Sequence, residues 1–414
     1  MGQRFKHRRT FAFMGGSGRE VHEAELFFRE LMGEEAYPKD STGLQRPATS
    51  KRITRPFQYN PLEQTDFLET PESPKRKKGS SYTADDARSA ADNVNPNYRH
   101  LNVSCDPQVF TFTHLHLERL CRLNYFDFKD DQERILFGLR GCKIVGCASA
   151  GNFHNSVQLS ESIPDHFTNN CVLGVWNRPE KKLAVFTGST VPNWGNIRKH
   201  LLGKRKANML LTGRYLYRVG KHKKVPGAFQ LRGKVVVLRS TDNLVYETTD
   251  EWDPCNPADN IHPAASSPYG DFGSAGCQTV TGSYRRNTHR GSWGKFRERA
   301  GLDPEDSSKR NGELYDYVLL TGREARLVSS GQGARLNRLR FGSKGKEVES
   351  LQEGLRHLKL YNGPKDGEMG PATVDAYMKW QKAEDNGTAD GIVTPSTARK
   401  LFFNLIRRRF STSS

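Results

Sequence analysis

Short apolar runs, rich in valine, leucine and aromatic residues, recur through the middle of the chain and alternate with clusters of glycine, asparagine and aspartate. Such runs are typical of β-strands joined by turns. Residues 172–176 and 183–187 flank a polar turn that contains proline, and they predict a β-hairpin. Further strands are expected at residues 209–219, 235–239 and 244–248. Residues 101–327 are therefore expected to form one globular domain of mostly antiparallel sheet with a few helices.

The N-terminal part of the chain shows a single helical pattern. Ser17 and Glu20 form a capping-box pair, and apolar residues then recur at helical spacing until Gly33. The pattern predicts an amphipathic helix over residues 18–32 on an arm, residues 1–98, that is otherwise typical of disordered chain. Such a helix either packs back on the main domain or docks to a partner, and the sequence leaves both open.

Near the C-terminus a short motif occurs twice, twenty-four residues apart. Each copy is an Asp-Gly pair followed by a proline and a threonine: Asp366, Gly367, Pro371 and Thr373, then Asp390, Gly391, Pro395 and Thr397. An Asp-Gly turn ends an extended segment, and proline at the first helical position begins a helix. The apolar stripe of a preceding helix is formed by Val348, Leu351, Leu355 and Leu358. Residues 341–404 are therefore expected to form a three-helix module, followed by a basic tail at 405–414.

The length of 414 residues exceeds one ordinary core, so we expect an α+β protein with the arm, a β-rich domain at residues 99–335 and the helical module. No run of about 18 apolar residues is present, and no membrane span is expected. The net charge of +18 attracts polyanions. Since no recognised nucleic-acid-binding motif accompanies this charge, nucleic acid is not the expected partner.

One pair of residues has the types and the setting needed for covalent catalysis. His262 precedes Cys277 by fifteen residues, and Cys277 follows Ser274 and Gly276 in a glycine-rich segment. Glycine lets backbone N–H groups approach a developing oxyanion, and histidine can take a thiol proton and return it to a leaving amine. The pattern therefore indicates a Cys277 nucleophile, His262 as base, Gly276 near the oxyanion and Ser274 supporting the loop.

Other readings of these residue types stay open. A cysteine in a glycine-rich turn can be merely buried, and Cys277 could instead pair with His289 as a cysteine peptidase. His114, His116 and Cys121 could be imagined as metal ligands, but they lack a suitable fourth partner. No metal and no cofactor are therefore expected.

The repeated motif resembles the three-helix peptidoglycan-binding domain of many cell-wall hydrolases and some phage proteins. The match runs from about residue 342 to residue 402 and includes, besides the repeat and the helical stripe, Gly345, Gln352, Gly370, Trp380, Gln381 and Leu401. The resemblance implies peptidoglycan as a partner. It also implies a ligand groove between helices, which here would involve Tyr361, Asp366, Trp380 and Asp390.

The His262 and Cys277 segment resembles the L,D-transpeptidase family, in which a histidine precedes a Ser/Thr-His-Gly-Cys motif in a β-rich domain. Here Ala275 replaces the second histidine of that motif, and Thr279 stands where an arginine is common. The carboxylate-binding arginine is therefore sought elsewhere, at Arg239 or Arg285. The resemblance implies attack on a peptidoglycan stem peptide to form a thioester, which an amine resolves in a transpeptidase and water in a carboxypeptidase.

The alternative function is a non-catalytic component that anchors a phage tail or a phage-tail-like particle to peptidoglycan. No conventional export signal is visible in the basic N-terminus, where residues 10–14 form too short an apolar core. We therefore expect synthesis in the cytoplasm and action at the cell wall or periplasm, or within a phage-like particle. The N-terminal arm would suit docking to such a particle.

Overall fold

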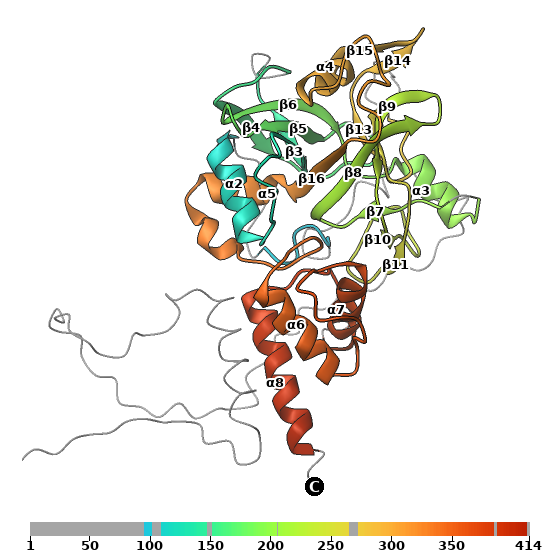
Figure 1. The fold of residues 1–414 in the computed structure, drawn as a ribbon. Helices are drawn as coiled ribbons and strands as arrows, with labels where there is room; N and C mark the ends of the chain where they lie inside the picture. Colours follow the sequence, from blue (N-terminus) through green and yellow to red (C-terminus); the bar gives the residue numbers. More distant parts are fainter. Residues whose placement is uncertain are drawn as a thin grey trace, which may run out of the picture.

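The computed structural model describes residues 95–101, 109–146, 151–204, 206–264, 272–384 and 387–411. The helix expected over residues 18–32 and most of the arm lie outside this part of the chain. Within it, a β-rich body carries a group of C-terminal helices on one side (Figure 1). The α+β class with mostly antiparallel sheet agrees with the sequence prediction. No helix among these residues is long and apolar enough to cross a bilayer.

The body is built around a closed barrel of eight strands. In pairing order they are β12 (Ile261–Pro263), β13 (Gln278–Val280), β6 (Lys182–Ser189), β5 (Cys171–Asn177), β2 (Arg134–Arg140), β16 (Leu314–Thr321), β8 (Gly213–His222) and β9 (Val225–Leu231). Neighbours are antiparallel except β12 with β13 and β2 with β16. The hairpin predicted from residues 172–176 and 183–187 is confirmed as β5 and β6. Leu173, Tyr217 and Phe229 are among the buried side chains of the barrel core.

Smaller sheets and helices surround the barrel. The sheets are β1 (Val109–Thr113), β4 (Ser156–Glu161) and β3 (Cys142–Ile144); β11 (Glu251–Cys255), β10 (Val235–Arg239) and β7 (Met209–Leu210); and β14 (Ser283–Arg285) with β15 (Thr288–Arg290). The helices are α2 (His114–Leu123), α3 (Trp194–Leu201), α4 (Gly291–Arg299), α5 (Gly322–Ser329) and the 3-10 turn η5 (Gln332–Leu336).

Two of the strand predictions were wrong. The strand expected at residues 209–219 is divided, because β7 pairs with β10 whereas β8 begins at Gly213 and pairs inside the barrel. Residues 244–248 form no strand, because the Asp250 carboxylate accepts hydrogen bonds from the backbone N–H groups of Thr241 and Glu247 and closes a loop. Local side-chain bonds of this kind compete with a sheet ladder for the backbone.

The C-terminal module contains α6 (Lys346–His357), α7 (Pro371–Glu384) and α8 (Pro395–Ser411), so both prolines begin helices as predicted. Helix α8 continues through most of the expected basic tail. Residues 95–98 of the expected arm pack against the body on the side of the module, and the Asn97 amide oxygen accepts a hydrogen bond from the buried Arg140 guanidinium at 2.8 Å.

The repeat in the sequence is also a repeat of hydrogen bonds. Gln352 donates to Asp366 at 2.7 Å and accepts from the Gly367 N–H at 3.1 Å. Gln381 makes the same two bonds to Asp390 and Gly391, at 2.7 and 2.9 Å. Each Asp-Gly turn is therefore fixed to the preceding helix by one buried glutamine.

The module and the body share a hydrophobic core. One cluster joins Val236 and Leu238 of β10 to side chains of all three module helices, including Leu355, Tyr377 and Leu401. Polar contacts cross the same boundary. The Trp252 indole N–H donates to Asp375 on α7 at 2.9 Å, and the Ala389 N–H donates to the Thr248 carbonyl at 2.7 Å. The module is thus packed on the β10–β11 sheet.

A buried ion pair holds the segment that leads into the module. The Arg340 guanidinium contacts Glu324 at 2.5 Å, and both side chains are fully buried. Glu324 also contacts His100 at 3.3 Å and accepts from the Thr321 hydroxyl at 2.9 Å, while Arg340 donates to Thr212 at 2.8 Å. Burial alone would raise the pKa of Glu324, but Arg340 and His100 hold it well below the usual range. The carboxylate is therefore ionised and fully paired.

We expect the Glu324→Gln variant to lose about 3–5 kcal/mol of unfolding free energy, because it leaves the Arg340 charge buried without a counterion. A carboxylate with a lowered pKa stabilises the fold above its unfolded pKa, so the wild-type advantage should persist at neutral pH and shrink in strong acid. Urea denaturation measures both effects. Glu180→Gln, which removes the partly exposed Lys182 pair, is the control and should leave the unfolding free energy almost unchanged. Equal losses in the two variants would contradict the prediction.

Candidate active site

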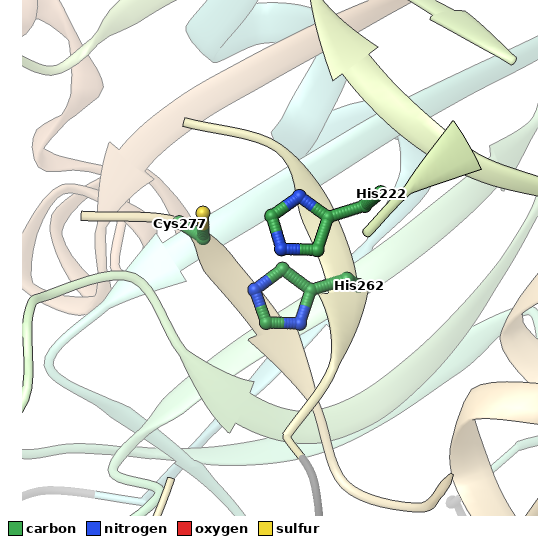
Figure 2. A group of neighbouring side chains, drawn as sticks. All are labelled: His222, His262 and Cys277. Atoms are coloured by element: carbon green, nitrogen blue, oxygen red, sulfur yellow. The ribbon is translucent and has the colours of Figure 1, made fainter. Parts of the chain in front are cut away.

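The barrel brings the histidine and the cysteine of the sequence motif together. Strands β12 and β13 pair in parallel, with His262 opposite Thr279. Cys277 immediately precedes β13, so its side chain lies at the end of the strand beside the His262 ring (Figure 2). A ring nitrogen of His262 and the Cys277 Sγ lie within 4.8 Å of each other. The two side chains are therefore close neighbours, and the Cys277 thiol donates its hydrogen bond to the Ala258 carbonyl oxygen at 3.7 Å.

The loop before Cys277 is fixed by its own hydrogen bonds. The buried Ser274 hydroxyl donates to the Cys277 carbonyl at 2.7 Å and accepts from the Gly276 N–H at 3.0 Å. The Asn208 N–H donates to the Ala275 carbonyl at 2.8 Å. Ser274 thus lies where it can support the loop. The Gly276 N–H, which the sequence placed near the oxyanion, is instead engaged by Ser274.

The His262 ring is oriented as a base. Its Nδ1 lies 2.7 Å from the Pro263 carbonyl oxygen, which can only accept a hydrogen bond. Nδ1 therefore carries the proton, and Nε2 keeps its lone pair. Burial, followed by the neighbouring His222 and Lys223, lowers the pKa of His262 to about 3. The imidazole is therefore neutral near pH 7 with a lone pair at Nε2, and the same burial disfavours the imidazolium that forms when this atom takes a proton.

A second histidine, His222, belongs to the site and was missed by the sequence analysis. Its ring stacks on His262 with centroids 4.3 Å apart and planes at 7°, and its ring nitrogen lies within 4.8 Å of the Cys277 Sγ (Figure 2). His222 ends β8, forty residues before His262, and no local motif surrounds it. It reaches the site because β9 pairs with both β8 and β12.

Parallel stacking argues against a metal ion on these three side chains. A metal ion lies close to the plane of each imidazole that binds it, about 2 Å from the nitrogen. Two nearly parallel rings stacked face to face share no such position. The orientation fits a pair of neutral imidazoles beside a thiol better than a set of metal ligands.

A pocket of about 290 Å³ opens beside Cys277 and is lined by both histidines. Its cationic side chains are Lys206, Lys223 and Arg239, and its carboxyl group is Asp259. Burial raises the pKa of Asp259 to about 8, despite the opposing effects of Arg239 and of a hydrogen bond from Asn208. Asp259 is therefore largely uncharged at neutral pH, and the pocket suits a ligand with a carboxylate.

The two candidate arginines lie in different places. Arg239 lines the pocket and is paired with Asp253, its Nη2 lying 2.8 Å from the Asp253 carboxylate. Arg285 is exposed on the β14–β15 hairpin and does not line the pocket. Arg239 therefore has the better position to contact a ligand in the pocket.

The other candidate constellations of the sequence do not come together. The His289 ring contacts Ser307 and accepts from the Trp293 indole N–H at 2.8 Å, away from the pocket. His116 forms a capping box with Thr113, and Cys121 is buried in the hydrophobic core. Among the residues described, only His222, His262 and Cys277 cluster as three possible metal-binding side chains.

The residues expected to line a glycan groove have mainly internal roles. Trp380 and Tyr361 are buried, and the Tyr361 hydroxyl donates to the Pro364 carbonyl at 2.8 Å. Asp390 is buried and bonded to Gln381, whereas Asp366 is exposed although bonded to Gln352. Asp366 is thus the most accessible of the four candidates.

Comparison with known proteins identifies the module. Residues 344–401 match the family described as "Putative peptidoglycan binding domain". The chain therefore carries a C-terminal peptidoglycan-binding domain, as the resemblance of the repeated motif implied.

One curated relative also belongs to cell-wall metabolism. The chain is 39% identical over 99 residues to the N-acetylmuramoyl-L-alanine amidase CwlM of Mycobacterium tuberculosis. The matched segment makes up 23% of this chain and 24% of the relative. The chain therefore spans about a quarter of the length of the relative that it matches. No solved structure matches the chain. The domain and the relative together support a cell-wall-related function.

The tight packing around Gly276 gives a direct test of the loop. A Cβ at this position would lie 2.3 Å from Asn208 Nδ2 and 2.5 Å from Asp259 Oδ1, on a backbone with a φ of +153°. We expect Gly276→Ala to displace the loop, to cost about 1–3 kcal/mol in chemical denaturation and to slow alkylation of Cys277. Gly273→Ala is the matched control, because a Cβ there meets nothing within 4 Å. Unchanged reactivity in Gly276→Ala would disprove this account of the loop.

Proposed function

We infer that the protein is a cysteine-dependent enzyme of peptidoglycan remodelling, an L,D-transpeptidase or carboxypeptidase that acts on stem peptides through a thioester. The main support is the position of the Cys277 Sγ beside the neutral His262 imidazole in a cationic pocket. This pocket lies in a body that is packed against a peptidoglycan-binding domain. The amidase relative supports the same setting of cell-wall chemistry.

The proposed reaction starts with transfer of the Cys277 thiol proton to His262 Nε2. The sulfur then attacks a stem-peptide carbonyl, forming the C–S bond while the carbonyl π electrons move to oxygen. When the tetrahedral adduct collapses, the C–N bond breaks and the amine leaves with the proton from His262. An acceptor amine in transfer, or water in hydrolysis, then gives a proton to His262 and attacks the thioester carbonyl. The C–S bond breaks, and the thiolate that leaves recovers the proton from His262.

The charges of the pocket support a peptide substrate with a free carboxylate. Lys206 and Lys223 lie on the pocket wall together with Arg239, and the nearby Asp259 is largely neutral. An exposed ammonium contributes long-range attraction at low salt but little specific binding energy. Arg239, held by Asp253 on one side, offers a positioned guanidinium for closer recognition.

The module has a structural connection to the proposed active site. Helix α7 packs on β10 and β11, and these strands carry the pocket residues Arg239 and Cys255. Peptidoglycan bound by the module is therefore held by the same rigid sheet that forms one wall of the pocket. This arrangement supports an enzyme kept on its polymeric substrate.

The proposal predicts a covalent adduct on one cysteine. Intact-mass and peptide mass spectrometry after incubation with purified stem peptides, or with a carbapenem, should find acylated Cys277 in the wild type. The Cys277→Ala variant should form no adduct but should still sediment with purified sacculi, because the module is unchanged. Cys255→Ala, which changes the other cysteine of the same pocket, is the control and should be acylated normally. Sacculus binding without an adduct in the wild type would favour the non-catalytic anchoring component.

The charge of the pocket predicts a selective effect on substrate binding. Lys206→Gln should raise the half-saturating concentration of a carboxylate-bearing stem peptide by up to about fivefold, since exposed ion pairs contribute about 0.2–1 kcal/mol. The turnover rate at saturation should change little, and the difference should disappear at high salt. Lys204→Gln is the control, because Lys204 is exposed nearby but does not line the pocket. The same effect in both variants would argue against a specific role for Lys206.

A further inference from the structure

The protonation state of His222 is fixed by its neighbours. The Asn260 amide oxygen accepts a hydrogen bond from the Leu231 N–H at 3.1 Å, so the Asn260 NH2 group faces His222. This NH2 group can only donate, and it lies 2.8 Å from His222 Nδ1. In the neutral ring, Nδ1 therefore accepts and Nε2 carries the proton. His222 is therefore a hydrogen-bond donor at its Nε2, whereas the Nε2 of His262 is a hydrogen-bond acceptor.

His222 stays neutral beside its partner for electrostatic reasons. Burial, reinforced by the Lys223 charge, lowers the pKa of His222 to about 4. The titratable and charged groups around it are Lys223 on its own hairpin, His262 on β12 and Cys277 before β13, with Lys206, Arg239 and Asp259 elsewhere on the pocket wall. Two stacked rings cannot both become cations without strong repulsion. Only one of them can take the thiol proton, and the tautomers assign this role to His262.

The backbone near Cys277 offers limited help to a negative charge. The Gly276 N–H is bonded to the Ser274 hydroxyl, and the Gln278 N–H donates to the Asn260 carbonyl at 2.9 Å. Both amides that flank Cys277 in sequence are therefore engaged. The His222 ring edge, by contrast, faces the sulfur (Figure 2).

We propose that His222 is a second catalytic histidine, a neutral hydrogen-bond donor that stabilises the negative charge which develops on Cys277 when His262 takes its proton. The inference rests on the proposed function, in which Cys277 is the nucleophile. In this step the S–H bond breaks, the proton passes to His262 Nε2, and the electron pair left on sulfur accepts the His222 Nε2–H. Hydrogen bonds to an ionised acceptor are about twice as strong as neutral ones. A neutral donor gives this stabilisation without placing a second positive charge against the His262 imidazolium.

The test measures the rate at which iodoacetamide alkylates Cys277 in the full chain, as a function of pH, by peptide mass spectrometry. Two variants separate the donor from the ring. His222→Phe keeps a flat ring for stacking but has no N–H, and His222→Gln keeps an N–H donor but has no ring. We expect His222→Phe to lower the rate at neutral pH about tenfold and to move the profile to higher pH, and His222→Gln to recover part of the loss.

Cys255 provides the internal control, because it is a partly exposed free cysteine of the same pocket whose alkylation can be followed in the same sample. Its rate should remain within about twofold of the wild type in both variants if the pocket is intact. A wild-type Cys277 profile in His222→Phe, or a larger loss in His222→Gln than in His222→Phe, would overturn the proposal and assign His222 a packing role. Alkylation needs no peptidoglycan, so this outcome is independent of whether stem peptides acylate Cys277.

Discussion

The parallel pairing of β12 with β13 is the constraint on which the candidate site depends. Both strands are short, and each is held on its other side by a further barrel strand, β9 beside β12 and β6 beside β13. A closed barrel has no edge along which one strand can slide, so the register of His262 against Thr279 is determined by all eight strands. The distance between base and thiol is thus a property of the whole body.

Burial then determines the chemistry that this geometry allows. Removing the imidazoles from water keeps both rings neutral, and their hydrogen bonds give them opposite roles at Nε2. The same effect leaves Asp259 largely uncharged, so the fixed charges of the pocket are positive. Partial exclusion of water from the end of the barrel therefore keeps both imidazoles and the Asp259 carboxyl uncharged, and hydrogen bonds divide the roles of base and donor between the two rings.

The sequence predicts those features of the molecule whose signals are local. The paired motifs at Asp366 and Asp390 define the module, and the proximity of His262 to Cys277 follows from a motif in which the cysteine comes fifteen residues after the histidine. His222 could not be found in this way, because three-dimensional pairing alone brings it to the site. The strand predicted at residues 244–248 was wrong for a different reason. Its apolar residues are buried, as those of a strand would be, but nearby backbone N–H groups donate to the Asp250 carboxylate instead of to a neighbouring strand. The hydrogen bond from the Gly276 N–H to the Ser274 hydroxyl likewise depends on the position of a side chain, which a pattern of residue types does not specify.

The shared hydrophobic core fixes the orientation of the peptidoglycan-binding domain relative to the β-rich body. A module on a flexible linker raises the local concentration of substrate and leaves its orientation open. Here Leu355 and Tyr377 pack in one cluster with Val236 and Leu238, and the Trp252 indole bonds to Asp375 across the boundary. Because Arg239 and Cys255 project from the same small sheet into the pocket, a wall polymer bound to the module has a fixed direction relative to Cys277. On the proposed function, only those stem peptides that this direction presents to the pocket would react. The domain would then contribute to selectivity as well as to affinity.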